Sequence, residues 1–304
     1  MDYRKKVTFA SALLGVLCLT AVLGVVFSQQ AVAQREAQAP LLTGFQASDI
    51  TGLTFGEVVL TKAPNWTLTY QGKAYPAAGD RIDTYVKSLQ ELLRERLVTR
   101  GSDVKAFGLD QGFKTVKILG AGGKVVADLQ VGGTNDLGDK VYVRFAGQKE
   151  VWQTDRGFAR SLDLDFNTWA DLSLFPGRKA DSLIRITFDS RIEAADKTVY
   201  APFDLVKSTK AGKPAWENSA TKTSADSIGT WAEQVASFRF GAFASPSDAP
   251  ASAATLGTVT LSWSDGTRTT VKIGAPDTKN RYRCTDGTRD FWINDWGLGQ
   301  ILYK

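Results

Sequence analysis

Residues 142–152 read Tyr142-Val-Arg-Phe-Ala-Gly147-Gln-Lys-Glu-Val-Trp152, and residues 282–292 read Tyr282-Arg-Cys-Thr-Asp-Gly287-Thr-Arg-Asp-Phe-Trp292. The two stretches share Tyr, Gly and Trp at a spacing of 140 residues. The match continues beyond the tryptophans, with Asp155, Gly157 and Leu162 against Asp295, Gly297 and Leu302. Such a repeat predicts one structural unit present twice. We interpret the repeated aromatic residues as strand residues and the glycines as turn residues, and so as architecture rather than a ligand site.

The stretches upstream of the two copies show the same order of predicted elements. Apolar residues spaced by three and four positions predict one amphipathic helix in each stretch. The helix residues are Ile82, Tyr85, Val86, Leu89, Leu92, Leu93 and Leu97 in the first stretch and Ile228, Trp231, Val235 and Phe238 in the second. Segments rich in β-branched and aromatic residues predict strands. They cover 57–62, 67–70, 115–118, 125–131, 141–145 and 150–154 in the first stretch, and 183–188, 257–263 and 269–273 in the second.

The predicted fold class is α+β, with two tandem related units that each combine an antiparallel sheet with one main amphipathic helix. Residues 41–175 form the first unit and residues 176–304 the second, because the Pro176-Gly177 step marks a break. Trp66 in Ala-Pro-Asn-Trp is matched to Trp216 in Lys-Pro-Ala-Trp. The opening strand of the second unit, 183–188, is matched to strand 57–62 of the first.

The amino-terminal region predicts a single transmembrane helix ahead of the two units. Residues 7–27 form a run of 21 residues without a charge, which spans about 30 Å as a helix, the thickness of a bilayer core. Residues 1–6 end in Arg-Lys-Lys, and no further charge occurs until Arg35. This asymmetry predicts a cytoplasmic terminus at residues 1–6 and an external location for residues 28–304. The Gln- and Ala-rich residues 28–40 are expected to form a tether.

The same region also contains a context for signal cleavage. Ala31-Val-Ala33 fits the small-residue pattern of a cleavage site, which would make Gln34 the first mature residue. An apolar run of this length exceeds the roughly 7–15 residues of a signal core and so favours an uncleaved signal-anchor. Both alternatives place the bulk of the chain outside the cytoplasm.

The composition excludes several classes of chemistry. The chain has no histidine and only two cysteines, Cys18 and Cys284. Ser-His-Asp triads, Cys-His pairs and histidine-ligated metal sites are therefore excluded. The net charge of +5 comes without a basic run, which argues against nucleic acid as a partner. We predict no catalytic, cofactor-binding or metal-binding residues, no cofactor and no enzyme activity.

Short motifs that resemble functional sites have simpler interpretations. Ser102–Lys105 and Ser219–Lys222 fit the Ser-x-x-Lys spacing of penicillin-recognising enzymes but lack their companion motifs. The glycines at 120–123 are not followed by the helix of a phosphate loop. Asp155 and Asp295 are expected to be turn or cap residues rather than a carboxylate pair. Three tryptophans would stack on sugars if exposed, although burial is the default for each: Trp263, Trp292 and Trp296.

Several spaced motifs resemble the DUF4340 family. They are Trp66, Tyr75-Pro-Ala77 before the helix, Ala106-Phe-Gly-Leu-Asp110, Gly132, and Tyr142 through Val151-Trp152. Phe107 replaces the family's usual tyrosine, and the second copy lacks the Gly-Leu-Asp motif. The resemblance covers about residues 45–304. It implies a bacterial, N-terminally anchored protein with an exported domain of uncharacterised activity, whose relatives occur beside components of gliding-type ABC transporters. It implies no catalytic residues.

These observations favour one function and leave two alternatives. We expect a non-enzymatic, single-pass protein of the bacterial cytoplasmic membrane that serves as an accessory or scaffold subunit of an envelope complex such as a gliding-type ABC transporter. Its expected partners are the membrane, through residues 7–27, and other proteins of that complex. The first alternative is a module that binds cell-wall glycan or peptide through aromatic residues. The second is a hydrolase that uses two carboxylates alone.

Overall fold

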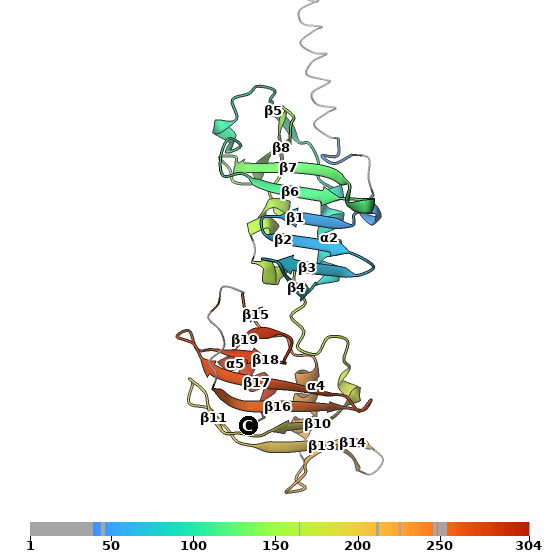
Figure 1. The fold of residues 1–304 in the computed structure, drawn as a ribbon, viewed down its shortest axis with the longest axis vertical. Coiled ribbons are helices and arrows are strands. Elements are labelled where there is room, and N and C mark those ends of the chain that lie inside the picture. Colours follow the sequence, from blue (N-terminus) through green and yellow to red (C-terminus); the bar gives the residue numbers. More distant parts are fainter. Residues whose placement is uncertain are drawn as a thin grey trace, which may run out of the picture. The chain divides into compact units, whose positions relative to one another are not determined.

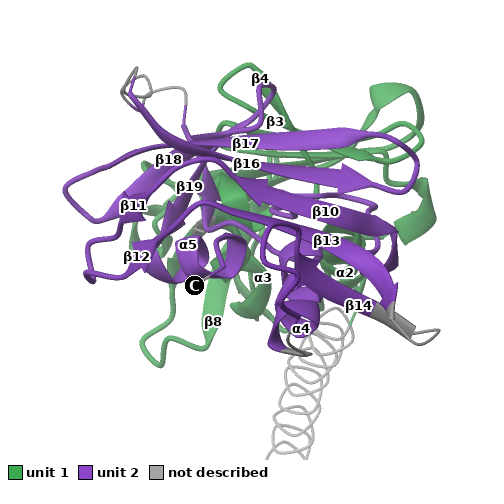
Figure 2. Cartoon of the chain, turned by 90° about the horizontal axis from the view of Figure 1, so that it is seen from below, with its two compact units in different colours: residues 1–169 green, residues 170–304 purple. Residues whose placement is uncertain are grey.

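The computed structural model describes residues 39–43, 46–163, 165–210, 213–224, 226–245, 248 and 254–303. The expected anchor at 7–27, the terminus at 1–6 and all but the last residues of the tether at 28–40 lie outside these described residues. Within the described ranges, no helix is both long enough and apolar enough to cross a membrane. The chain divides into unit 1, which ends at Trp169, and unit 2, which begins at Ala170 (Figure 2).

Unit 1 is built on a nine-stranded sheet in the order β4-β3-β2-β1-β6-β7-β8-β9-β5, in which every pairing is antiparallel (Figure 1). The strands are β1 (Gly52–Phe55), β2 (Val58–Lys62), β3 (Trp66–Tyr70), β4 (Lys73–Pro76), β5 (Arg96–Thr99), β6 (Lys114–Leu119), β7 (Val125–Thr134), β8 (Lys140–Phe145) and β9 (Val151–Asp155). The helices are α2 (Gly79–Gln90) and the short α3 (Gly157–Arg160). Helix α2 lies across one face of the sheet.

Unit 2 is built on an eight-stranded sheet in the order β14-β13-β10-β16-β17-β18-β19-β15, also antiparallel throughout. The strands are β10 (Leu183–Phe188), β13 (Phe203–Lys210), β14 (Lys213–Asn218), β15 (Ala242–Phe243), β16 (Thr255–Trp263), β17 (Arg268–Pro276), β18 (Arg281–Thr285) and β19 (Asp290–Asn294). A separate hairpin pairs β11 (Ile192–Glu193) with β12 (Val199–Tyr200). Helices α4 (Asp226–Ala236) and α5 (Asp295–Ile301) lie on one face of the sheet (Figure 2).

The two strand orders coincide, which confirms the α+β class and two related units. Strand β10 lies between β13 and β16, just as β1 lies between β2 and β6. From there the two orders match strand by strand, ending at the edge strands β15 and β5. Two elements differ between the units in the part of the chain that the structure describes: strand β4 has no counterpart in unit 2, and the β11–β12 hairpin has none in unit 1. The match of strand 183–188 to strand 57–62 was therefore wrong. Strand β10 corresponds to β1, and the inserted hairpin separates it from β13, the counterpart of β2.

The match between Trp66 and Trp216 agrees with this strand order, because β14 corresponds to β3. Both indoles are buried. A Cβ added to Gly79 of α2 would lie 3.7 Å from Cδ1 of Trp66, and a Cβ added to Gly229 of α4 would lie 3.7 Å from Cδ1 of Trp216. Each unit thus packs its main helix on an equivalent tryptophan.

The predicted leucine stripe runs beyond the end of α2. Ile82, Tyr85, Val86 and Leu89 are buried on the helix as expected, but the helix ends at Gln90. Leu93 is 45% exposed and Leu97 belongs to strand β5. The helix ends early because residues 39–41 form backbone hydrogen bonds with residues 92–94 (Leu41 N–H to Leu92 O, 2.6 Å; Arg94 N–H to Ala39 O, 2.9 Å). Tertiary pairing therefore overrides the local helical preference.

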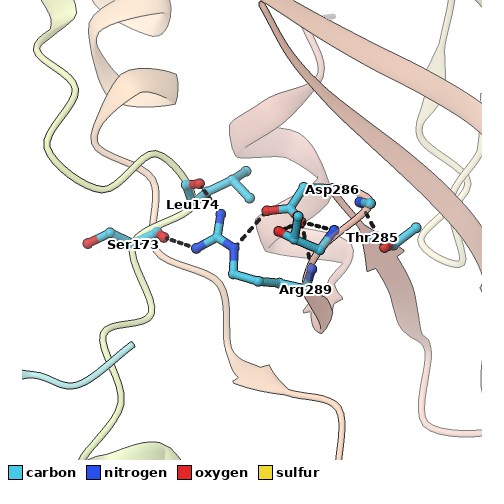
Figure 3. A network of polar contacts seen from close by, with 7 residues as sticks. Ser173, Leu174, Thr285, Asp286 and Arg289 are labelled. Carbon is cyan, nitrogen blue, oxygen red and sulfur yellow. Dashed lines mark hydrogen bonds and ion pairs between the residues drawn. The ribbon is translucent and has the colours of Figure 1, made fainter. Parts of the chain in front are cut away.

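Unit 2 begins with the same arrangement, so that residues 39–41 and 172–174 are equivalent leading segments. Leu174 N–H donates to Phe238 O and Phe240 N–H to Leu172 O, each at 3.0 Å. Arg289 adds a side-chain attachment in unit 2 (Figure 3). Its guanidinium donates to the carbonyl oxygens of Ser173 (3.0 Å) and Leu174 (2.6 Å), and its Nε donates to Asp286 (2.6 Å). These bonds hold residues 172–174 to unit 2, whose limit at Ala170 falls before the expected boundary between 175 and 176.

Candidate functional site

The repeated Tyr-Gly-Trp string marks the same hairpin in both units, but its side chains face opposite ways. In unit 1, buried Val143 pairs with buried Trp152. In unit 2, the equivalent buried pair is Cys284 with Phe291. The outer neighbours agree, because Leu97 of β5 pairs with Trp152 and Phe243 of β15 pairs with Phe291. Trp152 therefore corresponds to Phe291, not to Trp292.

The sequence match and the structural match differ because the hairpin of unit 2 is two residues shorter. The equivalent strand pairs are Val143 with Trp152 in unit 1 and Cys284 with Phe291 in unit 2. Gly147 and Gly287 keep the same place in the turn, with φ of 79° and 91°. A shift by one residue turns every strand side chain to the other face. Trp292 consequently occupies the position of Gln153. The interpretation of the string as architecture holds for Trp152 and for buried Tyr282, whereas Trp292 is only half-buried.

Each unit has a groove at the place where the segment after its main helix meets the end of the last long strand. Groove 1 has a volume of about 470 Å³ and is lined by Tyr85, Ser88, Glu91, Leu92, Leu93, Glu95, Asp155, Gly157, Phe158 and Ser161. Groove 2 has a volume of about 320 Å³ and is lined by Phe238, Arg239, Gly241, Ala242, Arg281, Trp292, Ile293, Asn294, Trp296 and Gly297.

The lining positions of the two grooves correspond. The Glu95 N–H donates to Gln153 O (2.9 Å), and the Gly241 N–H donates to Trp292 O (3.1 Å). Leu93 and Arg239 are equivalent because they bridge to Pro40 and Ser173 of the two leading segments. Further equivalent pairs are Asp155 with Asn294 and Lys140 with Arg281, which face each other across the last two strands of each unit. The groove is thus a duplicated feature of the fold.

Groove 1 has an acidic rim over an apolar floor. Leu92 and Phe158 are buried, while Glu91 and Asp155 are exposed. Lys140 Nζ lies 2.8 Å from Glu95 Oε1 and 3.9 Å from Asp155 Oδ2. The hydrogen bond to Glu95 raises the pKa of Lys140 above its ordinary value, and the charges of Glu95 and Asp155 act in the same direction. Lys140 does not line groove 1 itself but is held beside its rim by the carboxylates of Glu95 and Asp155.

Groove 2 lacks both of these carboxylates, because Gly241 and Asn294 occupy the equivalent positions. Its cation Arg281 instead donates through Nε (2.9 Å) and Nη2 (2.7 Å) to Asp277 in the preceding turn. Burial alone would raise the pKa of Asp277, but the hydrogen bonds from Arg281 and Lys279 lower it below its usual range. The guanidinium carbon of Arg281 lies 4.7 Å from the ring centre of Trp292, within the range of a cation–π contact.

The rim of groove 2 presents an aromatic and a cationic side chain to solvent. Trp296 is 69% exposed. Arg239 is 60% exposed and lies 3.8 Å from Asp171, a long ion pair. The floor is apolar, with Phe238 and Ile293 buried, and Trp292 is fixed by an indole N–H bond of 3.0 Å to Asp248. Tryptophan and arginine around a small apolar hollow are the residues that contribute most to protein–protein binding.

The three tryptophans singled out from the sequence occupy different positions in the structure. Trp263 is fully buried and donates to Thr269 Oγ1 at 3.1 Å, so it cannot stack on a sugar. Trp292 forms the wall of groove 2, and Trp296 is its exposed rim. Sequence alone did not bring Arg239 to the same groove, because the contact depends on where the chain turns after α4.

The remaining motif residues take structural positions. Ser219 Oγ donates to Asp204 at 2.6 Å, and Ser102 precedes a short 3₁₀ turn at Lys105–Phe107. The glycines at 120–123 form the turn between β6 and β7. Asp155 accepts from the Gly157 N–H (2.6 Å), in the turn before α3, as expected of a turn or cap residue, whereas Asp295 accepts from the Tyr282 hydroxyl (2.9 Å). In unit 2 it is Asn294 that caps the helix, by accepting from Gly297 N–H at 2.8 Å.

The architecture defines a duplicated α+β protein in which each unit repeats a groove beside its main helix. A family model described as Domain of unknown function (DUF4340) matches residues 66–258, more than half of the chain, and the chain belongs to this family. The match begins in β3 of unit 1 and ends in β16 of unit 2. No curated protein and no solved structure matches the chain.

Part of the family motif, from Phe107–Leu109 to Gly132, Tyr142 and Val151, forms a packed corner of unit 1. Trp66 and Tyr75 lie on β3 and β4, towards the other edge of the sheet. Gly108 has φ of 63°, which favours glycine. A Cβ on Gly132 would collide with the carbonyl oxygen of Phe107. Leu109 is buried in a cluster with Val104 and Val151. These motif residues therefore fix a close approach of two backbones and do not line either groove.

Proposed function

We propose that the protein is a non-enzymatic binding subunit, anchored by residues 7–27 with residues 28–304 outside the cytoplasmic membrane, and that groove 2 docks a protein partner. The observation that carries the docking proposal is the exposed Trp296 beside Arg239 over the buried Phe238 and Ile293. An exposed indole over an apolar hollow gains much from burial by a partner. The anchor is supported by the apolar run and the charges that precede it.

We further propose that the partner belongs to an envelope complex such as a gliding-type ABC transporter. Membership of the family supports this choice, through the association with such transporters that the resemblance implies. The duplicated unit supports a scaffold role, because two equivalent grooves of different chemistry allow two different partners to be held by one chain.

A co-purification experiment tests the docking proposal. Tagged full-length protein is cross-linked in membranes, solubilised and purified as wild type, Trp296→Ala, Arg239→Ala and Leu93→Ala, the last being the matched control at the position equivalent to Arg239. We expect a stoichiometric membrane partner with wild type and Leu93→Ala, and a loss of at least about tenfold in recovery with Trp296→Ala, the scale of a hot-spot residue. Failure of the wild type to recover any such partner, or full recovery by Trp296→Ala, would contradict the proposal.

Topology is tested separately. Protease added outside intact spheroplasts should digest residues 28–304 and spare a fusion placed before residue 1. Amino-terminal sequencing then distinguishes the uncleaved anchor, which begins at residue 1 or 2, from cleavage after Ala33, which yields Gln34. Protection of residues 28–304 from external protease would contradict the proposed location.

The glycan- or peptide-binding alternative is favoured by the same two tryptophans, Trp292 and Trp296, since indole faces also stack on sugar rings. The two-carboxylate hydrolase needs an acidic pair roughly 5–10 Å apart in a cleft, and it remains a hypothesis that an assay for glycan cleavage would test. Retention of partner co-purification by a variant that no longer binds glycan would separate the docking function from the alternative.

A further inference from the structure

One further difference between the units lies at the end of the sheet where β1 turns into β2. In unit 1 this end is covered by residues 165–169, the covering segment. Its Phe166 stacks on Tyr70 of β3 with ring centres 4.2 Å apart and planes inclined by 4°. The ring centre of its Trp169 lies 5.1 Å from that of Phe55 at the end of β1. Phe166 and Trp169 are both buried, so the covering segment completes the core of unit 1.

The covering segment is also attached to α2. The ring centre of Trp169 lies 5.0 Å from that of Tyr85 on the helix. The Ala78 N–H, at the start of α2, donates to Trp169 O at 2.8 Å. Arg81 Nη1 donates to Thr168 O at 3.0 Å. The first turn of the helix thus supplies hydrogen-bond donors to two backbone carbonyl oxygens of the covering segment.

The equivalent place in unit 2 follows from the strand pairing. Phe55 of β1 pairs with Val58 of β2, and Phe188 of β10 pairs with Phe203 of β13. Because β10 corresponds to β1 and β13 to β2, Phe188 takes the position of Phe55 and Phe203 that of Val58. Phe55, Val58 and Phe188 are buried, but Phe203 is only half-buried.

The positions on the main helices correspond as well. Gly79 of α2 and Gly229 of α4 are equivalent, because a Cβ on either would lie 3.7 Å from Cδ1 of the equivalent tryptophan of its unit. Trp231 of α4 therefore takes the position of Arg81 of α2. The buried helix positions agree with this register: Ile82, Tyr85 and Val86 in α2, and Ala232, Val235 and Ala236 in α4.

At this end of unit 2, three side chains in mutual contact form what we call the aromatic face: Phe203, Trp231 and Tyr303. The ring centre of Trp231 lies 5.7 Å from that of Phe203 and 5.3 Å from that of Tyr303. All three residues are half-buried, so part of each remains exposed to solvent. The aromatic face therefore leaves open an apolar area whose equivalent in unit 1 lies beneath the covering segment.

Trp231 also carries a hydrogen-bond donor that lacks an acceptor. Its Nε1 is buried and has no hydrogen-bond partner among the residues that the structure describes. A buried donor without an acceptor is unfavourable. In unit 1 the side chain at the equivalent position, Arg81, donates to a carbonyl oxygen of the covering segment. A segment that lay on unit 2 in the same way would offer a carbonyl oxygen to Trp231 and would cover the three rings.

We propose that the aromatic face of unit 2 binds a segment of another protein that carries two aromatic residues three positions apart, the pattern of Phe166 and Trp169 in the covering segment. Aromatic rings bury a large apolar area, and tryptophan and tyrosine are frequent among the residues that dominate protein–protein binding. The proposal goes beyond the docking at groove 2 and is independent of it, since the aromatic face shares no residue with the lining of that groove.

The probe for the experiment is a fluorescein-labelled peptide with the sequence of residues 165–172, Asp-Phe-Asn-Thr-Trp-Ala-Asp-Leu, because it reproduces the covering segment. Detergent-solubilised full-length protein is titrated into the peptide, and binding is followed by fluorescence anisotropy. A control peptide of the same length carries both Phe166→Ala and Trp169→Ala.

Three variants of the full-length protein locate the bound peptide. Tyr303→Ala removes one ring of the aromatic face. Trp231→Phe keeps an aromatic ring but removes the indole N–H. Trp296→Ala alters groove 2 and is the control. Thermal unfolding of each variant establishes that it is folded.

We expect saturable and equal binding of the probe by wild type and Trp296→Ala, and binding at least about tenfold weaker by Tyr303→Ala, the scale of a hot-spot residue. Trp231→Phe should bind roughly two- to tenfold more weakly, as expected when one neutral hydrogen bond is lost. The control peptide should bind wild type at least about tenfold more weakly than the probe, because it lacks both rings.

Absence of saturable binding by the wild type overturns the proposal, and so does equal binding of the two peptides. Unchanged affinity in Tyr303→Ala or in Trp231→Phe also overturns it, because the peptide would then lie elsewhere on the protein. Binding that Trp296→Ala abolishes would move the peptide to groove 2. The two proposals fail separately, since Trp296→Ala tests groove 2 and Tyr303→Ala tests the aromatic face.

Discussion

Groove 1 and groove 2 occupy the same place in two copies of one fold but differ in chemistry. In groove 1, Glu95 and Asp155 hold Lys140 at the rim. In groove 2 the equivalent positions are Gly241 and Asn294, and the cation Arg281 is drawn to Asp277 and stacks on Trp292. The difference teaches that equivalent core positions are buried in both units while the residues at the equivalent groove positions differ in charge and size. The groove of unit 2 is left with an exposed indole and an exposed guanidinium.

The largest predicted effect concerns the buried core that the two units share. Trp66→Ala and Trp216→Ala each remove a buried indole on which the main helix of its unit packs. Each should lower the free energy of unfolding of its own unit by about 3–5 kcal/mol. Urea unfolding combined with hydrogen exchange locates the loss in the mutated unit. A loss of stability below about 1 kcal/mol at either position would contradict the equivalence of the two tryptophans, because so small a loss is typical of surface positions.

The next effect concerns the two leading segments. Among the described residues, an arginine side chain attaches the leading segment of unit 2 but not that of unit 1. Arg289→Met leaves the largely buried Asp286 carboxylate without its cation and frees two carbonyl oxygens. We expect a loss of about 3 kcal/mol, typical of removing one partner of a buried ion pair. Hydrogen exchange at residues 172–174 should become faster, while exchange at residues 39–41 stays as in the wild type. Lys197→Met, which alters an exposed pair with Glu193, is the control and should change neither. Equal acceleration at both leading segments would contradict the assignment.

A smaller, pH-dependent effect is confined to groove 1. Glu95 raises the pKa of Lys140, so the folded state retains the proton more firmly than the unfolded state. The stabilisation is fully present below the ordinary lysine pKa of about 10.4 and is lost as the pH rises through the higher folded value. Glu95→Gln should therefore lower stability by about 0.5–1 kcal/mol near pH 8, and the difference from wild type should vanish at strongly alkaline pH. Glu91→Gln at the same rim is the control, and a pH-independent difference for Glu95→Gln would refute the account.

The smallest effect on stability is expected for the exposed side chains at the rims of the two grooves. Trp296→Ala and Leu93→Ala both remove exposed side chains. Each should change the free energy of unfolding by less than about 0.5 kcal/mol, as measured by urea unfolding. A large destabilisation by Trp296→Ala would show that the indole supports the fold and would weaken the case for docking.

Much of the fold was predictable because it depends on local patterns. The apolar spacing identified α2 and α4, and β-favouring segments located most strands of the two long meanders. The short strands β1, β4, β5 and β15 and the β11–β12 hairpin were missed because a few residues carry no periodicity. The longer strands β13 and β14 were not predicted either. The end of α2 was misplaced because Leu93 and Leu97 continue a helical pattern, while pairing with residues 39–41 stops the helix. Patterns within a segment cannot register a partner that is distant in the chain.

The site was less predictable than the fold for a related reason. The 140-residue spacing pairs Trp152 with Trp292, yet one is in the core and the other in a groove, because hairpin length decides which face a strand residue takes. Sequence drew attention to Trp292 and Trp296 as aromatic residues. It did not indicate Arg239 or Arg281, which tertiary pairing brings to groove 2.

Site-specific photo-cross-linking tests most directly the claim that the duplicated groove became a docking site in unit 2. A photoreactive phenylalanine is placed at position 296 or at the equivalent position 157 of full-length protein in native membranes. The account predicts a discrete adduct with a membrane protein from position 296, lost when Arg239→Ala is added, and no such adduct from position 157. An adduct of equal yield from both positions, or from position 157 alone, would contradict it.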